Sequence, residues 1–332
     1  MREGATREAM TIAPPSLDRV ERFRADLEAQ TGSTPGRLGV AVSGGPDSLA
    51  LLLLAAAAFP GQVEAATVDH GLRPESAAEA AFVANACSGL GVGHAILPLS
   101  WPETPAGNVQ AIAREARYAE LGVWAAARDI HWVATGHHLD DQAETLLLRL
   151  ARGSGIGGLS GIRPIGLFGR EGYAVWAVRP LLGWRKRELA EVVSDAGLEP
   201  VEDPSNQDQR FDRTRARELL ASTPWLAPER LAAAAANLAE AEAALSWMTH
   251  ALFRERAGGD PPGYTVDATG LPDELQRRLV RQLLQNLTGE DPAGPKLTRL
   301  LSTLQAGGTA TLCGVKCRGG DLWRFGPAPP HR

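Results

Sequence analysis

Short apolar runs alternate with longer helical stretches from about residue 37 onward, and this alternation constrains the fold more than any other feature of the chain. Apolar runs of strand length between amphipathic helices are typical of βαβ units, in which a buried parallel sheet carries helices on both faces. Ligands of such sheets bind beyond the carboxyl ends of the strands. We therefore predict an α/β domain. Its expected strands are 38–42, 63–68, 94–99, 131–135 and 173–178, and its expected helices are 48–59, 75–90, 108–128 and 139–151.

The pattern changes after about residue 200, where helical stretches dominate. A long Ala-rich helix is expected at 228–256, with Pro228 near its start, a position that proline tolerates. Further elements are expected as helices at 210–220, 271–287 and 296–304 and as a terminal hairpin at 309–325, broken at Gly319–Gly320. The sequence thus predicts a second, smaller and mainly helical domain. The expected parts are a disordered lead-in with a first helix (1–35), the α/β domain (36–222) and the helical domain (223–332).

Composition bounds the class of protein. The chain has 332 residues, 44% of them hydrophobic, which is enough for two cored domains, and a net charge of -5 that argues neither for nor against a nucleic-acid partner. Its three cysteines, Cys87, Cys313 and Cys317, form an odd, sparse set that suits a reducing cytoplasm. The first fifteen residues lack the apolar core of a signal peptide, and the apolar run 51–58 is too short to cross a bilayer. We expect a soluble, cytoplasmic protein with no membrane partner.

A glycine-rich turn joins the first predicted strand to its helix. It consists of Ser43, Gly44, Gly45, Pro46, Asp47 and Ser48. The glycines let the backbone turn sharply and bring N–H groups against an anion, and the dipole of the following helix favours negative charge there. The serines add hydroxyl donors, and Asp47, which alone would repel phosphate, is suited to hold a Mg²⁺ that bridges phosphate oxygens. The lysine of a Walker A loop is missing, so an ordinary P-loop is excluded. The plain alternative is a Gly-Pro-Asp turn with no ligand.

This turn resembles the SGGxDS signature of the PP-loop, or N-type, ATP pyrophosphatases. That family clamps the pyrophosphate end of ATP and leaves the α-phosphate open to a nucleophile, so its products are AMP and pyrophosphate. The resemblance implies that the α/β domain is a PP-loop ATP-binding catalytic domain that uses ATP and Mg²⁺.

A second motif, residues 135–145, carries two histidines and three carboxylates. On a helix that starts near Leu139, Asp141 and Glu144 share a face, and Asp140 and Glu144 pair at a spacing of four. Acidic residues at a helix start are also ordinary dipole chemistry. A zinc hydrolase fits poorly, because HEXXH spacing is absent and no third ligand group is evident. The string closely resembles the GHHxxDQxET block of the tRNA(Ile)-lysidine synthetases, which belong to the PP-loop family.

Other segments extend this resemblance over about residues 38–220. Residues 68–73 resemble the family's VDHGLR segment, although turn residues alone could explain them. Residues 152–159 contain G-x-G-x-x-G, but they follow a helix instead of a strand, so we reject a dinucleotide fingerprint and expect a flexible loop over the active site. Residues 179–182 and 202–206 continue the resemblance.

A run of arginines completes the resemblance: Arg210, Arg213, Arg215 and Arg217. The family usually shows Arg-Asn where this chain has Arg213-Thr214, which puts a role for an asparagine amide in doubt. On a helix, Arg210, Arg213 and Arg217 share one face, and such a face binds phosphate well. The alternative is a solvated charged face.

The resemblance implies a reaction in two steps. O2 of the cytidine at the first anticodon position of tRNA(Ile), in a CAU anticodon, attacks the α-phosphate of ATP, and the ε-amine of free L-lysine then displaces AMP at C2 to form lysidine. By the same resemblance, ATP is bound by residues 43–48 with Asp69 and His137, catalysis involves Asp47, Asp141, Glu144, Arg213 and Arg217, and Mg²⁺ is held by Asp47 and Asp141. The resemblance also implies that the helical domain (223–332) is a tRNA- or substrate-binding domain. tRNA contacts are expected from Arg152, Arg210, Arg277 and Arg281, with plain surface charge as the alternative. A homodimer is one option for the assembly.

Three rival functions are weaker. A PP-loop tRNA thiolase typically needs CxxC pairs, whereas Cys313 and Cys317 are spaced CxxxC and Cys87 stands alone. An amide-forming PP-loop ligase needs a glutaminase domain or partner to supply ammonia, and the sequence shows no such domain. A tRNA-binding protein with a dead nucleotide site has no need of acids such as Asp47 and Asp141. The sequence therefore favours the lysine-joining enzyme.

Overall fold

The computed structural model describes residues 12–71, 76–99, 109–170, 172–200, 212–259 and 263–328. The chain divides into two compact units, Met1–Ala239 and Glu240–Arg332, and the division falls within the long helix α9 (Pro228–Arg256). Each unit has a hydrophobic core of its own. None of the helices in the described residues is both long enough and apolar enough to cross a membrane.

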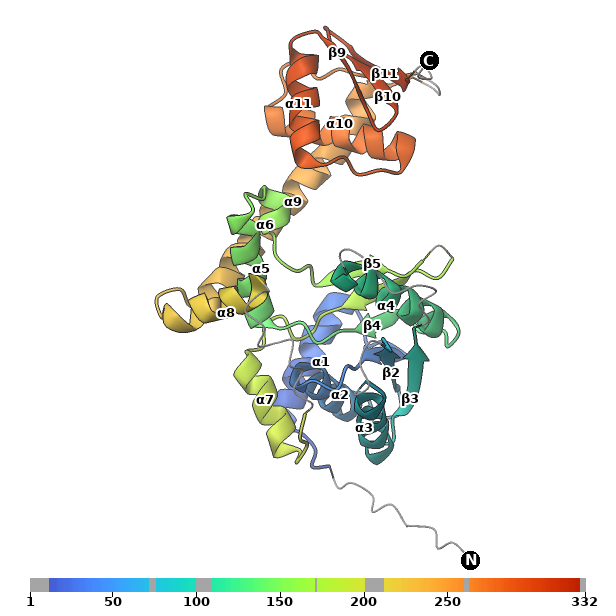
Figure 1. The fold of residues 1–332 in the computed structure, drawn as a ribbon, viewed down its shortest axis with the longest axis vertical. Helices are drawn as coiled ribbons and strands as arrows, with labels where there is room; N and C mark the ends of the chain where they lie inside the picture. Colours follow the sequence, from blue (N-terminus) through green and yellow to red (C-terminus); the bar gives the residue numbers. More distant parts are fainter. Residues whose placement is uncertain are drawn as a thin grey trace, which may run out of the picture. The chain divides into compact units, whose positions relative to one another are not determined.

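The first unit is built on a six-stranded sheet with the order β3-β2-β1-β4-β6-β5. Figure 1 shows part of this sheet, with β2 and β3 side by side. The pairs from β3 to β6 are all parallel, which confirms the predicted parallel sheet. The sequence did not predict β5, which pairs antiparallel with β6 and contains a glycine that weakens any strand signal. The strands are β1 (Leu38–Ala41), β2 (Val63–Asp69), β3 (Gly93–Pro98), β4 (Trp132–Ala134), β5 (Ile165–Phe168) and β6 (Val175–Val178).

Helices cover both faces of this sheet, as predicted. One face packs against α1, α2, α3 and α7, and the other against α4. Side chains alternate along β2, so Ala65 lies in the core on the side of α1, α2, α3 and α7, and its neighbour Ala66 lies in the core on the side of α4. The helices are α1 (Leu17–Thr31), α2 (Pro46–Ala58), α3 (Ser76–Gly89), α4 (Val109–Ala126) and α7 (Lys186–Asp195), of which the sequence did not predict α7.

The order of the central strands positions the site. Because β1 and β4 are parallel neighbours, the segments that follow them meet at the same edge of the sheet. The first leads into α2, and the second leads into α5 (Leu139–Ala151), which has the bounds predicted from the sequence. Helix α5 then packs against α6 (Ile156–Leu159) and α8 (Asp212–Ser222).

The second unit combines helices with a five-stranded antiparallel sheet in the order β7-β8-β11-β10-β9. Its helices are the end of α9, α10 (Asp273–Thr288) and α11 (Gly294–Gln305), and its strands are β7 (Ala257–Gly258), β8 (Tyr264–Val266), β9 (Thr309–Leu312), β10 (Val315–Arg318) and β11 (Trp323–Pro327). Leucines of α10 and α11 pack with Val315, Cys317, Trp323 and Phe325 in its core. The predicted terminal hairpin is therefore a three-stranded part of a larger sheet. Strands β7 and β8 are too short to leave a sequence pattern.

Candidate active site

The turn between β1 and α2 is shaped to face an anion. Gly44 has a φ of 87°, in the left-handed region that glycine favours. Ser48 Oγ accepts from the Ser43 N–H at 3.1 Å and donates to the Gly45 carbonyl at 2.9 Å, so the turn is closed on itself. Helix α2 begins at Pro46, and within the described residues no side chain caps its first turn. Its N-terminal N–H groups and its dipole are thus available to phosphate oxygens.

The start of α5 lies against this turn. Gly136 precedes α5, and a Cβ added to Gly136 would stand only 3.1 Å from the carbonyl carbon and oxygen of Asp47 and 3.2 Å from the Ser48 nitrogen. A side chain at position 136 would therefore push the two segments apart. Gly136 is part of the GHHxxDQxET-like string, but the sequence carries no signal for its role in this contact.

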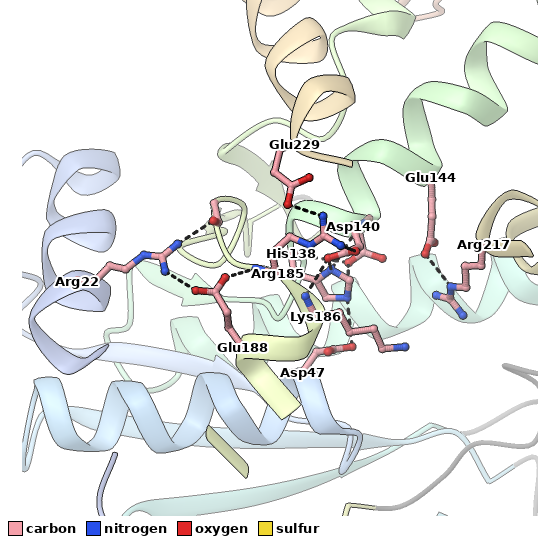
Figure 2. A network of polar contacts seen from close by, with 12 residues as sticks. Arg22, Asp47, His138, Asp140, Glu144, Arg185, Lys186, Glu188, Arg217 and Glu229 are labelled. Carbon is pink, nitrogen blue, oxygen red and sulfur yellow. Dashed lines mark hydrogen bonds and ion pairs between the residues drawn. The ribbon is translucent and has the colours of Figure 1, made fainter. Parts of the chain in front are cut away.

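His138 joins the two segments (Figure 2). Its Nδ1 accepts from the Asp141 N–H at 3.3 Å, while its own N–H donates to Asp141 Oδ2 at 3.1 Å, so His138 is the N-cap of α5 in a reciprocal capping box. Because Nδ1 accepts, the ring proton is on Nε2, which faces Asp47 Oδ2 at 3.5 Å. The resemblance implied a nucleotide-binding role for His137 but none for His138.

The electrostatics of His138 follow from this position. The side chain is 2% exposed, and burial lowers the pKa of an imidazole. The hydrogen bond to Asp47 and the negative charges of Asp141 and Asp140 outweigh burial, so the pKa of His138 is raised. The ring therefore stabilises the carboxylates around it.

Asp47 and Glu144 each present a free oxygen to the site. Asp47 Oδ1 and Glu144 Oε2 are buried and have no hydrogen-bond partner among the described residues. Glu144 Oε1 accepts from Arg217 Nε of α8 at 2.7 Å (Figure 2). Burial raises the pKa of Glu144, and Arg217 offsets only part of that rise. Buried carboxylate oxygens without a donor are suited to a cation or an amine.

The three acids of α5 have different surroundings. Asp140 faces the start of α7, where it accepts from the Lys186 N–H at 2.8 Å and pairs with Arg185 at 3.2 Å. Asp141 lies beside His138, and Glu144 faces α8. The sequence placed Asp140 and Glu144 as a pair at a spacing of four, but the structure gives them separate partners. Asp140 therefore contacts the start of α7, whereas Asp141 faces His138 and Glu144 faces Arg217.

His137 lies among positive charges. Its Nδ1 is 2.9 Å from Thr135 Oγ1. Burial lowers the pKa of His137 to about 4; Asp141 opposes this shift, and Arg179, Arg114 and Arg213 reinforce it. A neutral imidazole surrounded by guanidinium groups is a setting that favours a phosphate. Arg114 of α4 was missed in the sequence because an arginine on an amphipathic helix carries no motif of its own.

The remaining predicted site residues that the structure describes form local turns or ion pairs. Asp69, at the end of β2, accepts from the Gly71 N–H at 2.9 Å and so forms a local turn. Arg152 pairs with Asp212 at 2.7 Å, and both side chains are exposed. Arg210 lies outside the described residues. In the second unit, Arg277 pairs with Glu274, and Arg281 pairs with Asp291 at 3.2 Å. Within the described residues, no group of three or more His, Cys, Asp or Glu side chains is placed to hold a metal ion.

The fold and the turn define a PP-loop protein. Residues 17–223 match the family model described as the PP-loop domain. A U34-tRNA thiolase, NcsA, from Methanococcus maripaludis has a similar fold, with a TM-score of 0.55 and 16% identity over 67% of this chain and 79% of that chain. At this identity the likeness concerns the fold alone.

Two curated relatives narrow the class. The tRNA(Ile)-lysidine synthase of Novosphingobium aromaticivorans is 49% identical over 314 residues, which cover 94% of each chain. The enzyme of the same name from Zymomonas mobilis is 46% identical over 301 residues, which cover 90% of each chain. The chain belongs to the tRNA(Ile)-lysidine synthase family, whose PP-loop domain uses ATP.

Proposed function

We propose that this chain joins free L-lysine to C2 of the cytidine at the first anticodon position of tRNA(Ile) with a CAU anticodon, and that it converts ATP to AMP and pyrophosphate. One observation carries the proposal. The uncapped start of α2 and the acids of α5 meet at one edge of the sheet, where Asp47 and His138 are 3.5 Å apart. ATP and tRNA are cytoplasmic, so we place the reaction there.

In the first step, residues 43–48 hold the β- and γ-phosphates of ATP, so that O2 of the cytidine attacks the α-phosphate and pyrophosphate leaves. The N–H groups at the start of α2 donate to these phosphates, and the dipole of α2 stabilises their charge. Arg213 lies near the same region, because its positive charge lowers the pKa of both His137 and Glu144. We assign it to the charge that develops on the α-phosphate. We also place Asp69 and His137 on the nucleotide.

In the second step, the ε-amine of lysine attacks C2 and AMP leaves. The amine must attack in its neutral form, so a carboxylate has to take its proton. The pKa of Glu144, which burial raises, makes this side chain a stronger base than an ordinary carboxylate, and Oε2 has no donor among the described residues. We assign proton transfer to Glu144, with Arg217 holding its other oxygen and Asp141 beside it.

Mg²⁺ fits the same site. It binds proteins through one or two carboxylates together with phosphate oxygens, and Asp47 Oδ1 is a buried carboxylate oxygen without a donor in the described residues. We assign Asp47 and Asp141 as its ligands. When bound, the ion neutralises charge on the phosphates of ATP.

A transfer assay tests the proposal. The protein is incubated with ATP, radiolabelled lysine and an unmodified tRNA(Ile) transcript with a CAU anticodon. We expect label in the RNA and equimolar release of pyrophosphate. Asp47→Asn is expected to lower pyrophosphate release by about 100-fold or more while tRNA binding remains. Glu229→Gln, which changes an exposed acid paired with Arg185, is the control. RNA that stays unlabelled with active, folded protein contradicts the proposal.

A further inference from the structure

One face of the five-stranded sheet in the second unit is basic. Side chains alternate along each strand, so Val315 and Cys317 of β10 and Trp323 and Phe325 of β11 point into the core. The side chains between them point to solvent. We call this solvent side the basic sheet face; its residues are Lys316, Arg318, Arg324, Thr265, Thr309 and Thr311. Helices α10 and α11 lie on the opposite side of the sheet (Figure 1).

Strand register brings the cations together. Arg318 is directly opposite Arg324, and Lys316 lies two residues before Arg318 on the same side of β10. Thr309 and Thr311 of β9 are opposite Arg318 and Lys316, and Thr265 of β8 is opposite Arg324. The face thus combines three cations with three hydroxyl groups and contains no carboxylate.

The arginines of α10 differ from these cations. Arg277, Arg278 and Arg281 are paired with Glu274, Glu242 and Asp291. Lys316, Arg318 and Arg324 form no ion pair within the described residues. Like charges directly opposite on neighbouring strands destabilise a sheet, so the Arg318–Arg324 pair opposes folding unless an anion lies between or above the two side chains.

We propose that the basic sheet face binds the sugar–phosphate backbone of the tRNA substrate; this inference rests on the proposed function. Phosphate contacts in RNA complexes come from lysine and arginine and from hydroxyl groups, which is the composition of this face. Large apolar side chains, which a protein partner or a bilayer would bury, are absent from its six residues. Arg277 and Arg281, which the sequence suggested, are already neutralised by acids.

The experiment compares two triple variants. Lys316→Gln/Arg318→Gln/Arg324→Gln removes the charge of the basic sheet face. Arg254→Gln/Lys296→Gln/Arg299→Gln removes the same number of positive charges from exposed positions on α9 and α11, away from the basic sheet face. The KM for tRNA in lysine transfer and the affinity for tRNA are measured against salt concentration. For the first variant we expect the KM to rise about tenfold or more, the slope of log affinity against log salt to fall by about 2–3, and kcat at saturating tRNA to remain. The second variant is expected to stay within about twofold.

A single variant separates a loss of tRNA binding from a loss of folding. Arg324→Glu places a carboxylate opposite Arg318, which favours the fold and repels phosphate, so thermal stability is kept while the KM for tRNA rises. Unchanged KM and salt slope in both sheet variants would overturn the inference. So would a loss of binding to vesicles with anionic lipids while tRNA binding is kept. If the wild-type protein transfers no lysine, the proposed function fails, and direct tRNA binding by the two triple variants still tests the face.

Discussion

At the scale of single residues, His138 has two separable contacts. Nδ1 accepts from the backbone of Asp141, and Nε2 faces the Asp47 carboxylate. Asparagine places a hydrogen-bonding atom near the position of Nδ1, and glutamine places one near that of Nε2. We therefore treat His138 as a positioning residue that fixes one oxygen of Asp47 and leaves the other free for the reaction.

His138→Asn is expected to keep the stability of the protein within about 1 kcal/mol, because asparagine is a good N-cap. It is expected to lower kcat for pyrophosphate release by about 10- to 100-fold, because Asp47 is no longer held. His138→Gln is expected to show the reverse balance, with more activity left and a helix start weakened by about 1 kcal/mol. Thermal unfolding and pyrophosphate release measure the two effects. An Asn variant with wild-type kcat would show that the contact to Asp47 does not matter.

His137 makes stability depend on pH. The pKa of His137 is about 4 in the folded protein, below the ordinary histidine value of 6.5. Below pH 6.5 the unfolded chain therefore binds a proton that the folded chain does not bind. Stability therefore falls as the pH drops from 6.5 toward 4, and at pH 5 the loss from this group is about 2 kcal/mol. Urea unfolding of wild type and His137→Gln at pH 7 and pH 5 tests this. We expect a smaller loss in the variant, whereas the exposed control His131→Gln is expected to behave as wild type.

At the scale of elements, the Glu144–Arg217 contact joins α5 to α8. Glu144 is 3% exposed at its side chain and Arg217 is 32% exposed, so the pair is half-buried. Removing one partner leaves a buried carboxylate uncompensated, which destabilises more than removing both.

Arg217→Met is expected to lower the free energy of unfolding by about 2 kcal/mol, which is less than for a fully buried pair because Arg217 is partly exposed. The double variant Glu144→Gln/Arg217→Met is expected to recover part of this loss. Urea denaturation of the two single variants and the double variant gives the coupling free energy. Strictly additive effects would mean that the contact does not hold α8 on α5.

At the scale of the whole molecule, the separate cores of the two units predict separable unfolding. Leu284 is fully buried in the core of the second unit. Leu284→Ala is expected to destabilise that unit by about 2–5 kcal/mol and to lower the transition assigned to it in calorimetry. The unfolding transition of the first unit and its ATP binding are expected to change little, because the core of the first unit shares no residue with the core of the second unit. One cooperative transition that shifts as a whole would contradict this. Light scattering of the same sample tests whether the chain forms the homodimer that the sequence left as one option.

The sequence by itself determined features whose physics is local. The βα turn at 43–48 carries its chemistry in consecutive residues. Helices α5 and α9 have clear starts, at a cluster of acidic residues and at Pro228, and both helices have their predicted bounds. The sequence did not predict β5, in which a glycine weakens the strand signal, or β7 and β8, which have only two and three residues.

The tertiary structure alone decided which group faces which. Helical spacing placed Asp140, Asp141 and Glu144 near one another, but only packing turned Asp140 toward α7 and Glu144 toward Arg217. Likewise, only strand register placed Arg318 opposite Arg324. The physical reason is that periodicity fixes the face of an element on which a side chain lies, whereas the partner on that face comes from another part of the chain.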